Sequence, residues 1–189
     1  MPLMWFSEYG QDGNLDKRMN EIQKGEAMKS KVILRDVVED DLPIFFEHQN
    51  DPDASRMAAF TAKDPADQSA FRAHWNRIMG DKQILIKTIL YNGVVAGHVL
   101  SFEQFGKKAV SYWVAKEYWG KGIATKALAG FLAQVTIRSL YARAAKDNIG
   151  SIRVLEKCGF NLTGDDKGYS NARGDEVEEF ILKLEDWKR

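Results

Sequence analysis

The chain has 189 residues, of which 44% are hydrophobic and 11% aromatic, a composition that fills a real core and argues against wholesale disorder. Lysine plus arginine and aspartate plus glutamate both number 27, so nothing in the overall charge favours binding to nucleic acid or to an anionic membrane. The single cysteine, Cys158, excludes an internal disulfide framework and a multi-cysteine metal site. We therefore expect a cytoplasmic protein with no metal, no nucleic-acid partner and no membrane segment.

The first part of the chain divides into an extension and the start of a domain. Residues 1–30 carry no sustained pattern, and we predict an N-terminal extension there and a single domain over residues 31–189. The β-prone run 32–34 predicts a short strand. An acidic segment beginning at Glu39 then predicts a helix, which ends before the turn at residues 50–52 because a proline disfavours helix at the preceding residue.

A second helix and three strands follow. Apolar residues three and four apart predict a helix that ends at Gly80. Two apolar runs, 84–90 and 94–102, are joined by Asn92-Gly93, which is the strongest short signal for a β-hairpin. A third strand is predicted over 108–114.

The second half of the chain alternates helices and strands. One apolar helix face runs over 123–135, a short strand is predicted at 140–144, and a helix follows from Asn148 to Gly159. The last strand is predicted at 177–184. This order predicts a mixed α/β fold whose sheet is covered by helices on both faces.

A glycine-containing loop joins the strand that ends at Val114 to the next helix. Gly120 and Gly122 lie in this loop, where small residues let an anion approach unpaired backbone N–H groups and the helix dipole adds partial positive charge. The loop matches neither the P-loop pattern nor the dinucleotide-binding pattern. It is therefore either a site for a phosphate-bearing ligand or an ordinary strand–turn–helix junction.

A second segment, Asn148 to Phe160, follows the next short strand, and together with Tyr118 to Thr125 it resembles the GNAT superfamily of N-acetyltransferases. The resemblance covers about residues 31–187 and is greatest to the branch of ribosomal-protein N-terminal acetyltransferases. It implies a mostly antiparallel central sheet, splayed in the middle, with helices on both faces. It also implies acetyl-CoA as the acyl donor and direct transfer of acetyl to a primary amine, on a protein N-terminus or a small molecule. The alternative is a CoA-binding module without turnover, and a homodimer is a further possible partner.

The resemblance assigns a donor site to named residues. The main chain of residues 112–114 pairs with the pantetheine arm, and the N–H groups of residues 119–125 hold the pyrophosphate. The superfamily usually has glutamine or arginine where this chain has Trp119. Asn148 contacts the pantetheine arm, caps its helix, or does both. The expected donor-binding residues are Tyr112, Trp113, Val114, Trp119, Gly120, Lys121, Gly122, Ile123, Ala124, Thr125 and Asn148.

Two catalytic residues are expected. The resemblance places Ser151 near the thioester sulfur, where its hydroxyl donates a proton or hydrogen bond to the leaving thiolate, although a serine in a first helical turn also has a purely structural reading. Leu155 stands where many members carry a tyrosine as general acid. The attacking amine must be neutral, so a base is useful, and we favour Glu103 at a strand end. The candidates for this base are His98, Ser101, Glu103, Glu47 and His48.

Overall fold

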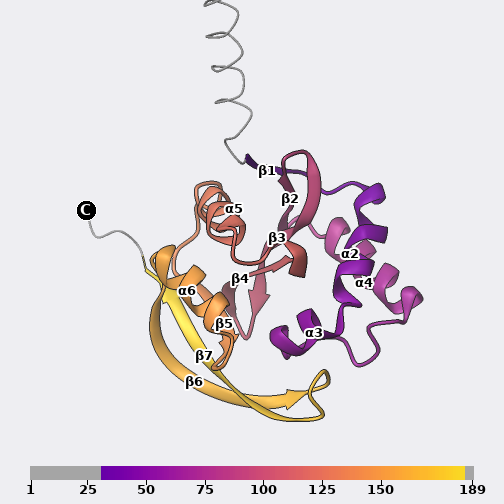
Figure 1. Ribbon diagram of the computed structural model, residues 1–189. Helices are drawn as coiled ribbons and strands as arrows, with labels where there is room; N and C mark the ends of the chain where they lie inside the picture. Colours follow the sequence, from indigo (N-terminus) through magenta and orange to yellow (C-terminus); the bar gives the residue numbers. More distant parts are fainter. Residues whose placement is uncertain (1–30, 186–189) are drawn as a thin grey trace, which may run out of the picture. The chain divides into compact units, whose positions relative to one another are not determined.

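The computed structural model describes residues 31–185, which form a seven-stranded sheet flanked by helices (Figure 1). Residues 1–30, where we expect an extension, lie outside the described residues, so the predicted division of the chain stays a prediction. The strands are β1 (Val32–Arg35), β2 (Leu85–Tyr91), β3 (Val94–Gln104), β4 (Lys107–Val114), β5 (Leu140–Ala145), β6 (Asn161–Ser170) and β7 (Asp175–Leu184). The helices are α2 (Leu42–Gln49), α3 (Pro52–Ala58), α4 (Gln68–Gly80), α5 (Ile123–Leu132) and α6 (Ile149–Lys157), with 3-10 turns η1 (Glu39–Asp41) and η2 (Lys116–Tyr118).

The sheet consists of two antiparallel parts that meet at β4 and β5. Its strand order is β1-β2-β3-β4-β5-β7-β6, and only β4 and β5 run parallel. Along this parallel junction the strands pair at one position, Ala109 with Tyr141, and then separate. This confirms the expected mixed, mostly antiparallel sheet with a splay in its middle.

Helices cover both faces because neighbouring residues of a strand point to opposite sides. On β3, Val99 packs in the cluster that contains α5, whereas the adjacent His98 contacts Phe45 of α2 and Trp75 of α4. The α5 face holds the larger core, in which Phe131 is fully buried. This arrangement confirms the predicted helices on both faces of the sheet.

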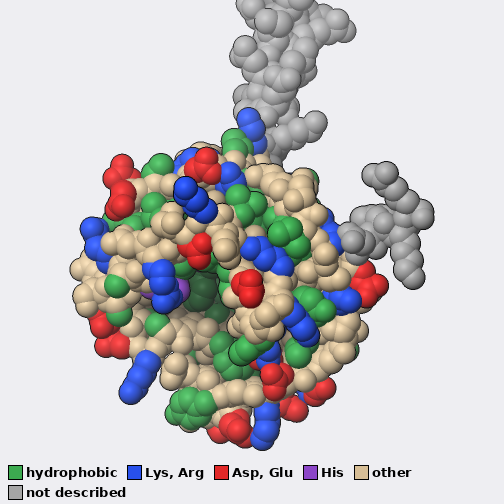
Figure 2. Space-filling view, turned by 180° about the vertical axis from the view of Figure 1, so that it is seen from behind, with side chains coloured by type: hydrophobic (Ala, Val, Ile, Leu, Met, Phe, Trp, Pro, Cys, Tyr) green, Lys and Arg blue, Asp and Glu red, His purple; other side chains and the backbone are tan. Residues whose placement is uncertain are grey.

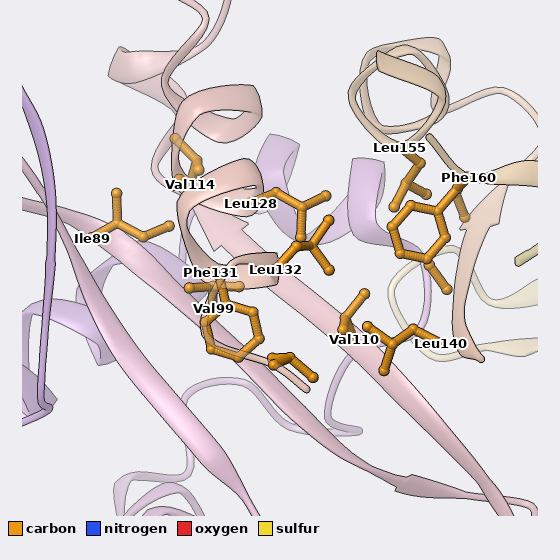
Figure 3. Packing of buried hydrophobic residues seen from close by; sticks show 14 of the residues in the cluster. Ile89, Val99, Val110, Val114, Leu128, Phe131, Leu132, Leu140, Leu155 and Phe160 are labelled. Carbon is orange, nitrogen blue, oxygen red and sulfur yellow. The ribbon is translucent and has the colours of Figure 1, made fainter. Parts of the chain in front are cut away.

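The main core also fixes the two helices that border the splay. Leu128 and Leu132 of α5 point toward β4, while Leu155 of α6 and Phe160 lie near Leu140 of β5 (Figure 3). Each of these side chains is at most 7% exposed. Packing in the main core therefore holds α5 beside β4 and α6 beside β5, on the two sides of the splay.

One helix was not predicted from the sequence. Helix α3 begins with Pro52, and the side chain of Asp51 caps it by accepting a hydrogen bond from the Ala54 N–H at 2.8 Å. Aspartate at the N-cap followed by proline is a recognised helix start, but the helix is short and lacks an apolar period. Among residues 31–185, no helix is long and apolar enough to cross a membrane.

Candidate active site

The splay between β4 and β5 leaves a strip of main chain without a strand partner. Ala115 N–H donates to the Ala96 carbonyl of β3 at 2.9 Å, and the Trp113 main chain also faces β3. Because main-chain groups alternate along a strand, those of Tyr112 and Val114 face the opposite side, toward the splay. Of the predicted pantetheine edge, these two residues turn their peptide groups toward a ligand, and Trp113 does not; the Val114 carbonyl also accepts the indole N–H of Trp119.

The close approach of β3 and β4 at this point requires glycine. A Cβ atom on Gly97 would lie 1.9 Å from the Trp113 carbonyl oxygen. The neighbouring Ala96 is an extra residue on β3, since Leu90 pairs with Val95 while Ile89 pairs with Gly97. Bulges of this kind redirect a strand, and here the bulge lies beside the end of β4 where the splay is widest.

The glycine loop has the backbone conformation expected of an anion site. Gly120 and Gly122 have φ of +74° and +71°, values that favour glycine, and Gly122 is the N-cap of α5. The first hydrogen bond of this helix start runs from Lys126 N–H to the Gly122 carbonyl, at 3.2 Å. The Trp119 N–H, which we expected at the pyrophosphate, donates instead to the Lys116 carbonyl at 3.1 Å. Within residues 31–185, the backbone N–H groups from 120 to 125 have no acceptor, so they are available to a pyrophosphate.

Side chains around the loop hold it in place. Ile123 is 1% exposed, so only its backbone N–H remains available to a ligand. The Lys121 ammonium lies 5.5 Å from the centre of the Tyr118 ring. The centre of the Tyr118 ring lies 5.8 Å from that of Tyr91 in β2. Trp119 is 39% exposed, and its indole N–H donates to the Val114 carbonyl at 2.7 Å. Trp119, which stands where the superfamily usually has glutamine or arginine, therefore connects the loop to the end of β4.

Asn148 occupies the N-cap of α6, which confirms the predicted capping role. Its side-chain oxygen accepts from Ser151 N–H at 3.0 Å. Its amide nitrogen donates to the carbonyl of Met57 in α3 at 3.1 Å. Asn148 thus links α6 to α3, while its predicted contact with pantetheine stays a prediction.

Ser151 has a partner that the sequence did not reveal. The hydroxyl of Tyr112, on β4, lies 2.8 Å from Ser151 Oγ and 3.3 Å from the Ser151 carbonyl oxygen. Burial raises the pKa of Tyr112 to about 12, although the hydrogen bond with Ser151 acts in the opposite direction. The two residues are 39 positions apart in sequence, and no local pattern signals their contact.

Helix α3 bridges the two arms of the splay and lines a cavity of about 340 Å³. Lys116, which follows β4, forms an ion pair with Asp53 of α3. Arg173, in the β6–β7 turn, donates to the Arg56 carbonyl at 2.8 Å and pairs with Asp147 at 2.7 Å. The cavity lies among these segments and is lined by Asp53, Arg56, Met57, Lys116, Trp119, Asp147 and Arg173.

The space-filling view from behind shows a hollow near the middle of the molecule (Figure 2). Hydrophobic side chains lie inside it, a histidine is visible at its wall, and charged side chains surround it. Concave apolar surfaces with a few polar groups are typical of ligand-binding sites.

The structure does not bring Glu103 together with the other predicted site residues. Glu103 pairs with Lys108 at the start of β4 and is exposed, whereas the splay opens near Val114. The six residue-to-residue steps from Lys108 to Val114 span about 20 Å of strand. A base at Glu103 would therefore act from the wrong end of β4.

The other candidates for the base also differ in position. Ser101 is buried opposite Val110, and Glu47 is exposed on α2. Burial lowers the pKa of His98 to about 3, and its Nδ1 has no hydrogen-bond partner among the described residues.

Burial also lowers the pKa of His48, and the nearby charge of Glu117 in η2, just beyond the end of β4, acts in the opposite direction. His48 therefore favours its neutral form more than an exposed imidazole does.

The family of the chain follows from a comparison with known domains. The family described as "Acetyltransferase (GNAT) domain" matches residues 31–161, which is more than half of the chain. The chain therefore belongs to the GNAT acetyltransferase family. The expectations of an N-acetyltransferase and of acetyl-CoA as acyl donor are confirmed.

Individual relatives agree with this assignment. The chain is 28% identical over 142 residues to the "Putative ribosomal N-acetyltransferase YdaF" of Bacillus subtilis (strain 168), covering 68% of this chain and 78% of that protein. An acetyltransferase (GNAT family) from Bacillus anthracis superposes with a TM-score of 0.67 at 20% identity, over 83% of this chain and 96% of that one. Mycobacterium smegmatis RimJ, in complex with CoA-disulfide, superposes with a TM-score of 0.66 at 23% identity. The match covers 82% of this chain and 81% of that one. At these identities the two structures show a shared fold.

Proposed function

We propose that the protein transfers acetyl from acetyl-CoA to the α-amine of a polypeptide N-terminus; its relative YdaF is named a "Putative ribosomal N-acetyltransferase". The observation that carries this choice of acceptor is a set of exposed apolar side chains near α3 and on the segments that are hydrogen-bonded to this part of the chain. Met57, Phe60, Ile149 and Tyr169 are between 38% and 65% exposed. Exposed apolar side chains beside a cleft favour a polypeptide, because a small polar amine makes no use of them.

The residues of the splay fit the proposed donor. The unpaired N–H groups from Gly120 to Thr125 would hold the pyrophosphate, and the cleft-facing peptide groups of Tyr112 and Val114 would hold the pantetheine amides. When bound, acetyl-CoA supplies a thioester whose carbonyl carbon accepts the amine. Holding this carbon beside the amine accounts for much of the catalysis, because the reaction becomes effectively unimolecular.

The remaining chemistry concerns protons. We propose that the Ser151 hydroxyl, at the first turn of α6, donates a hydrogen bond to the departing sulfur. We propose His48 as the base that removes the amine's proton, directly or through water, because its lowered pKa favours the neutral form. The His48→Gln variant should lose about tenfold or more in kcat and lose the acidic limb of the pH–rate profile. An unchanged acidic limb would reject His48.

The choice of acceptor is tested with the purified full chain, acetyl-CoA and two panels of amines. One panel holds peptides with free N-termini and the same peptides with blocked N-termini, and the other holds polyamines, amino acids and aminoglycosides. We expect thiol release and mass-spectrometric acetylation of the free α-amines only. Turnover restricted to the small amines would overturn the polypeptide acceptor, and CoA binding without turnover on either panel would support a binding module instead.

A further inference from the structure

The contact between Tyr112 and Ser151 joins the two arms of the splay at the place where the donor's sulfur is expected. Tyr112 extends from β4, which separates from β5 after Ala109, and Ser151 lies in the first turn of α6. The hydroxyl oxygens are 2.8 Å apart, which is a short, ordinary hydrogen bond between hydroxyl groups. It fixes the position of a serine side chain that otherwise rotates freely about its Cα–Cβ bond.

Either hydroxyl group can donate in this contact, and the distances allow the phenol to donate to Ser151 Oγ. A phenol has one hydrogen to donate, and Tyr112 has two acceptors within reach, Ser151 Oγ at 2.8 Å and the Ser151 carbonyl at 3.3 Å. The nearer acceptor gives the stronger bond. When the phenol donates to Oγ, the hydrogen of the serine hydroxyl is left free to donate elsewhere.

We propose that Tyr112 is the positioning residue of Ser151: it donates to Ser151 Oγ and so directs the serine hydrogen toward the sulfur that leaves in the reaction. This inference rests on the proposed role of Ser151. It assigns to the Tyr112 side chain a role separate from that of its main chain at the pantetheine edge. Leu155 cannot contribute in this way, because it is an aliphatic residue that is 1% exposed in the core.

The proton balance of the step is simple. The amine nitrogen forms a bond to the carbonyl carbon, the carbon–sulfur bond breaks, and its electron pair goes to sulfur. The proton lost by the nitrogen passes to a base and in the end to the sulfur or to solvent. With a pKa of about 12, Tyr112 keeps its proton throughout, so its hydroxyl group acts by hydrogen bonding alone.

A double-mutant cycle tests the inference in kinetic terms. Tyr112→Phe should lower kcat about three- to tenfold, as expected for one hydrogen bond, and leave KM for acetyl-CoA within about twofold. In a Ser151→Ala background the same change should have no effect on kcat, because the residue through which it acts is missing. In a Ser151→Thr background, which keeps the hydroxyl, the effect should return.

A second readout does not depend on turnover. The product CoA is bound to each variant, and the pKa of its thiol is measured from the ultraviolet absorbance of the thiolate. A hydrogen bond from Ser151 to sulfur favours the thiolate, so the bound thiol should have a lower pKa in the unmodified protein than in Tyr112→Phe or Ser151→Ala. Desulfo-CoA, which lacks the sulfur, should bind all variants with equal affinity.

The outcomes separate the two proposals. Equal losses from Tyr112→Phe in the serine and alanine backgrounds would show a purely structural tyrosine and overturn the inference, while leaving Ser151 in place. An unchanged kcat in Ser151→Ala, with the chemical step limiting, would overturn both roles. Neither result changes which amine is acetylated, because acceptor identity is scored by the position of the acetyl group.

Discussion

The indole N–H of Trp119 donates to the carbonyl of Val114 at 2.7 Å, joining the first residue of the glycine loop to the last residue of β4. The two parts of the predicted donor site, one for pyrophosphate and one for pantetheine, are therefore mechanically connected. A carbonyl has two lone pairs, so the Val114 oxygen can accept from the indole and from a pantetheine amide together. Trp119 acts through its side chain, because its backbone N–H already donates to the Lys116 carbonyl at 3.1 Å.

The Trp119→Phe variant removes this bond and keeps an aromatic ring. We expect CoA affinity to fall about three- to tenfold, because the loop loses its connection to the edge of β4. Isothermal titration calorimetry with CoA measures the change. Equal or tighter binding would mean that the indole competes with the ligand for Val114.

The Gly122→Glu variant places a carboxylate where the pyrophosphate is expected, at a position with φ of +71°. We expect CoA binding to be lost through charge repulsion and steric blockage, while the protein stays folded. Gly106→Glu is a matched control, because Gly106 has φ of +69°, would have no atom within 4 Å of an added Cβ, and lies in the turn before β4. Undiminished CoA affinity in a folded Gly122→Glu protein would reject the loop assignment.

The Gly97→Ala variant adds a methyl group 1.9 Å from the Trp113 carbonyl oxygen. Since backbone must move to relieve this contact, we expect a loss of about 2 kcal/mol or more in the free energy of unfolding, with weaker CoA binding as β4 shifts. Chemical denaturation measures the first effect. Gly80→Ala serves as the control, because nothing lies within 4 Å of the added atom, and it should be close to neutral.

His98 should make the protein less stable in mild acid. Burial lowers its pKa from 6.5 to about 3, so the unfolded chain binds a proton below pH 6.5 that the folded protein does not. Stability therefore falls as the pH drops from 6.5 toward 3, by about 2 kcal/mol at pH 5. His98→Phe keeps a ring beside Phe45 and Trp75 and removes the titration. Its stability should change less than that of the unmodified protein between pH 7 and pH 5, and an equal change would contradict the account.

Local signals in the sequence predicted much of the fold. The Asn92-Gly93 turn, with φ of 52° and 85°, joins β2 to β3 as expected, and Gly159 ends α6 with φ of 91°. These features depend on the conformation of one or two residues, which sequence reveals directly. The bounds of β6 were not predicted, because its residues Asn161–Ser170 are mainly polar and glycine-containing and show no alternation.

The site was predicted less completely, because it depends on register and on contacts between distant residues. The glycine loop was found from its own composition. Glu103 was chosen because it ends a strand, but antiparallel pairing with Lys108 places that strand end away from the splay. The contact of Tyr112 with Ser151 brings together a strand and a helix that are 39 positions apart, which no spacing along the chain encodes.

A crystal structure of the protein with bound CoA tests the account most directly. We predict that the pyrophosphate accepts hydrogen bonds from N–H groups between Gly120 and Thr125, that the pantetheine amides pair with the main chain of Tyr112 and Val114, and that the sulfur lies within hydrogen-bond distance of Ser151 Oγ. CoA bound with its pyrophosphate away from this loop, or with its sulfur remote from Ser151, would contradict the account.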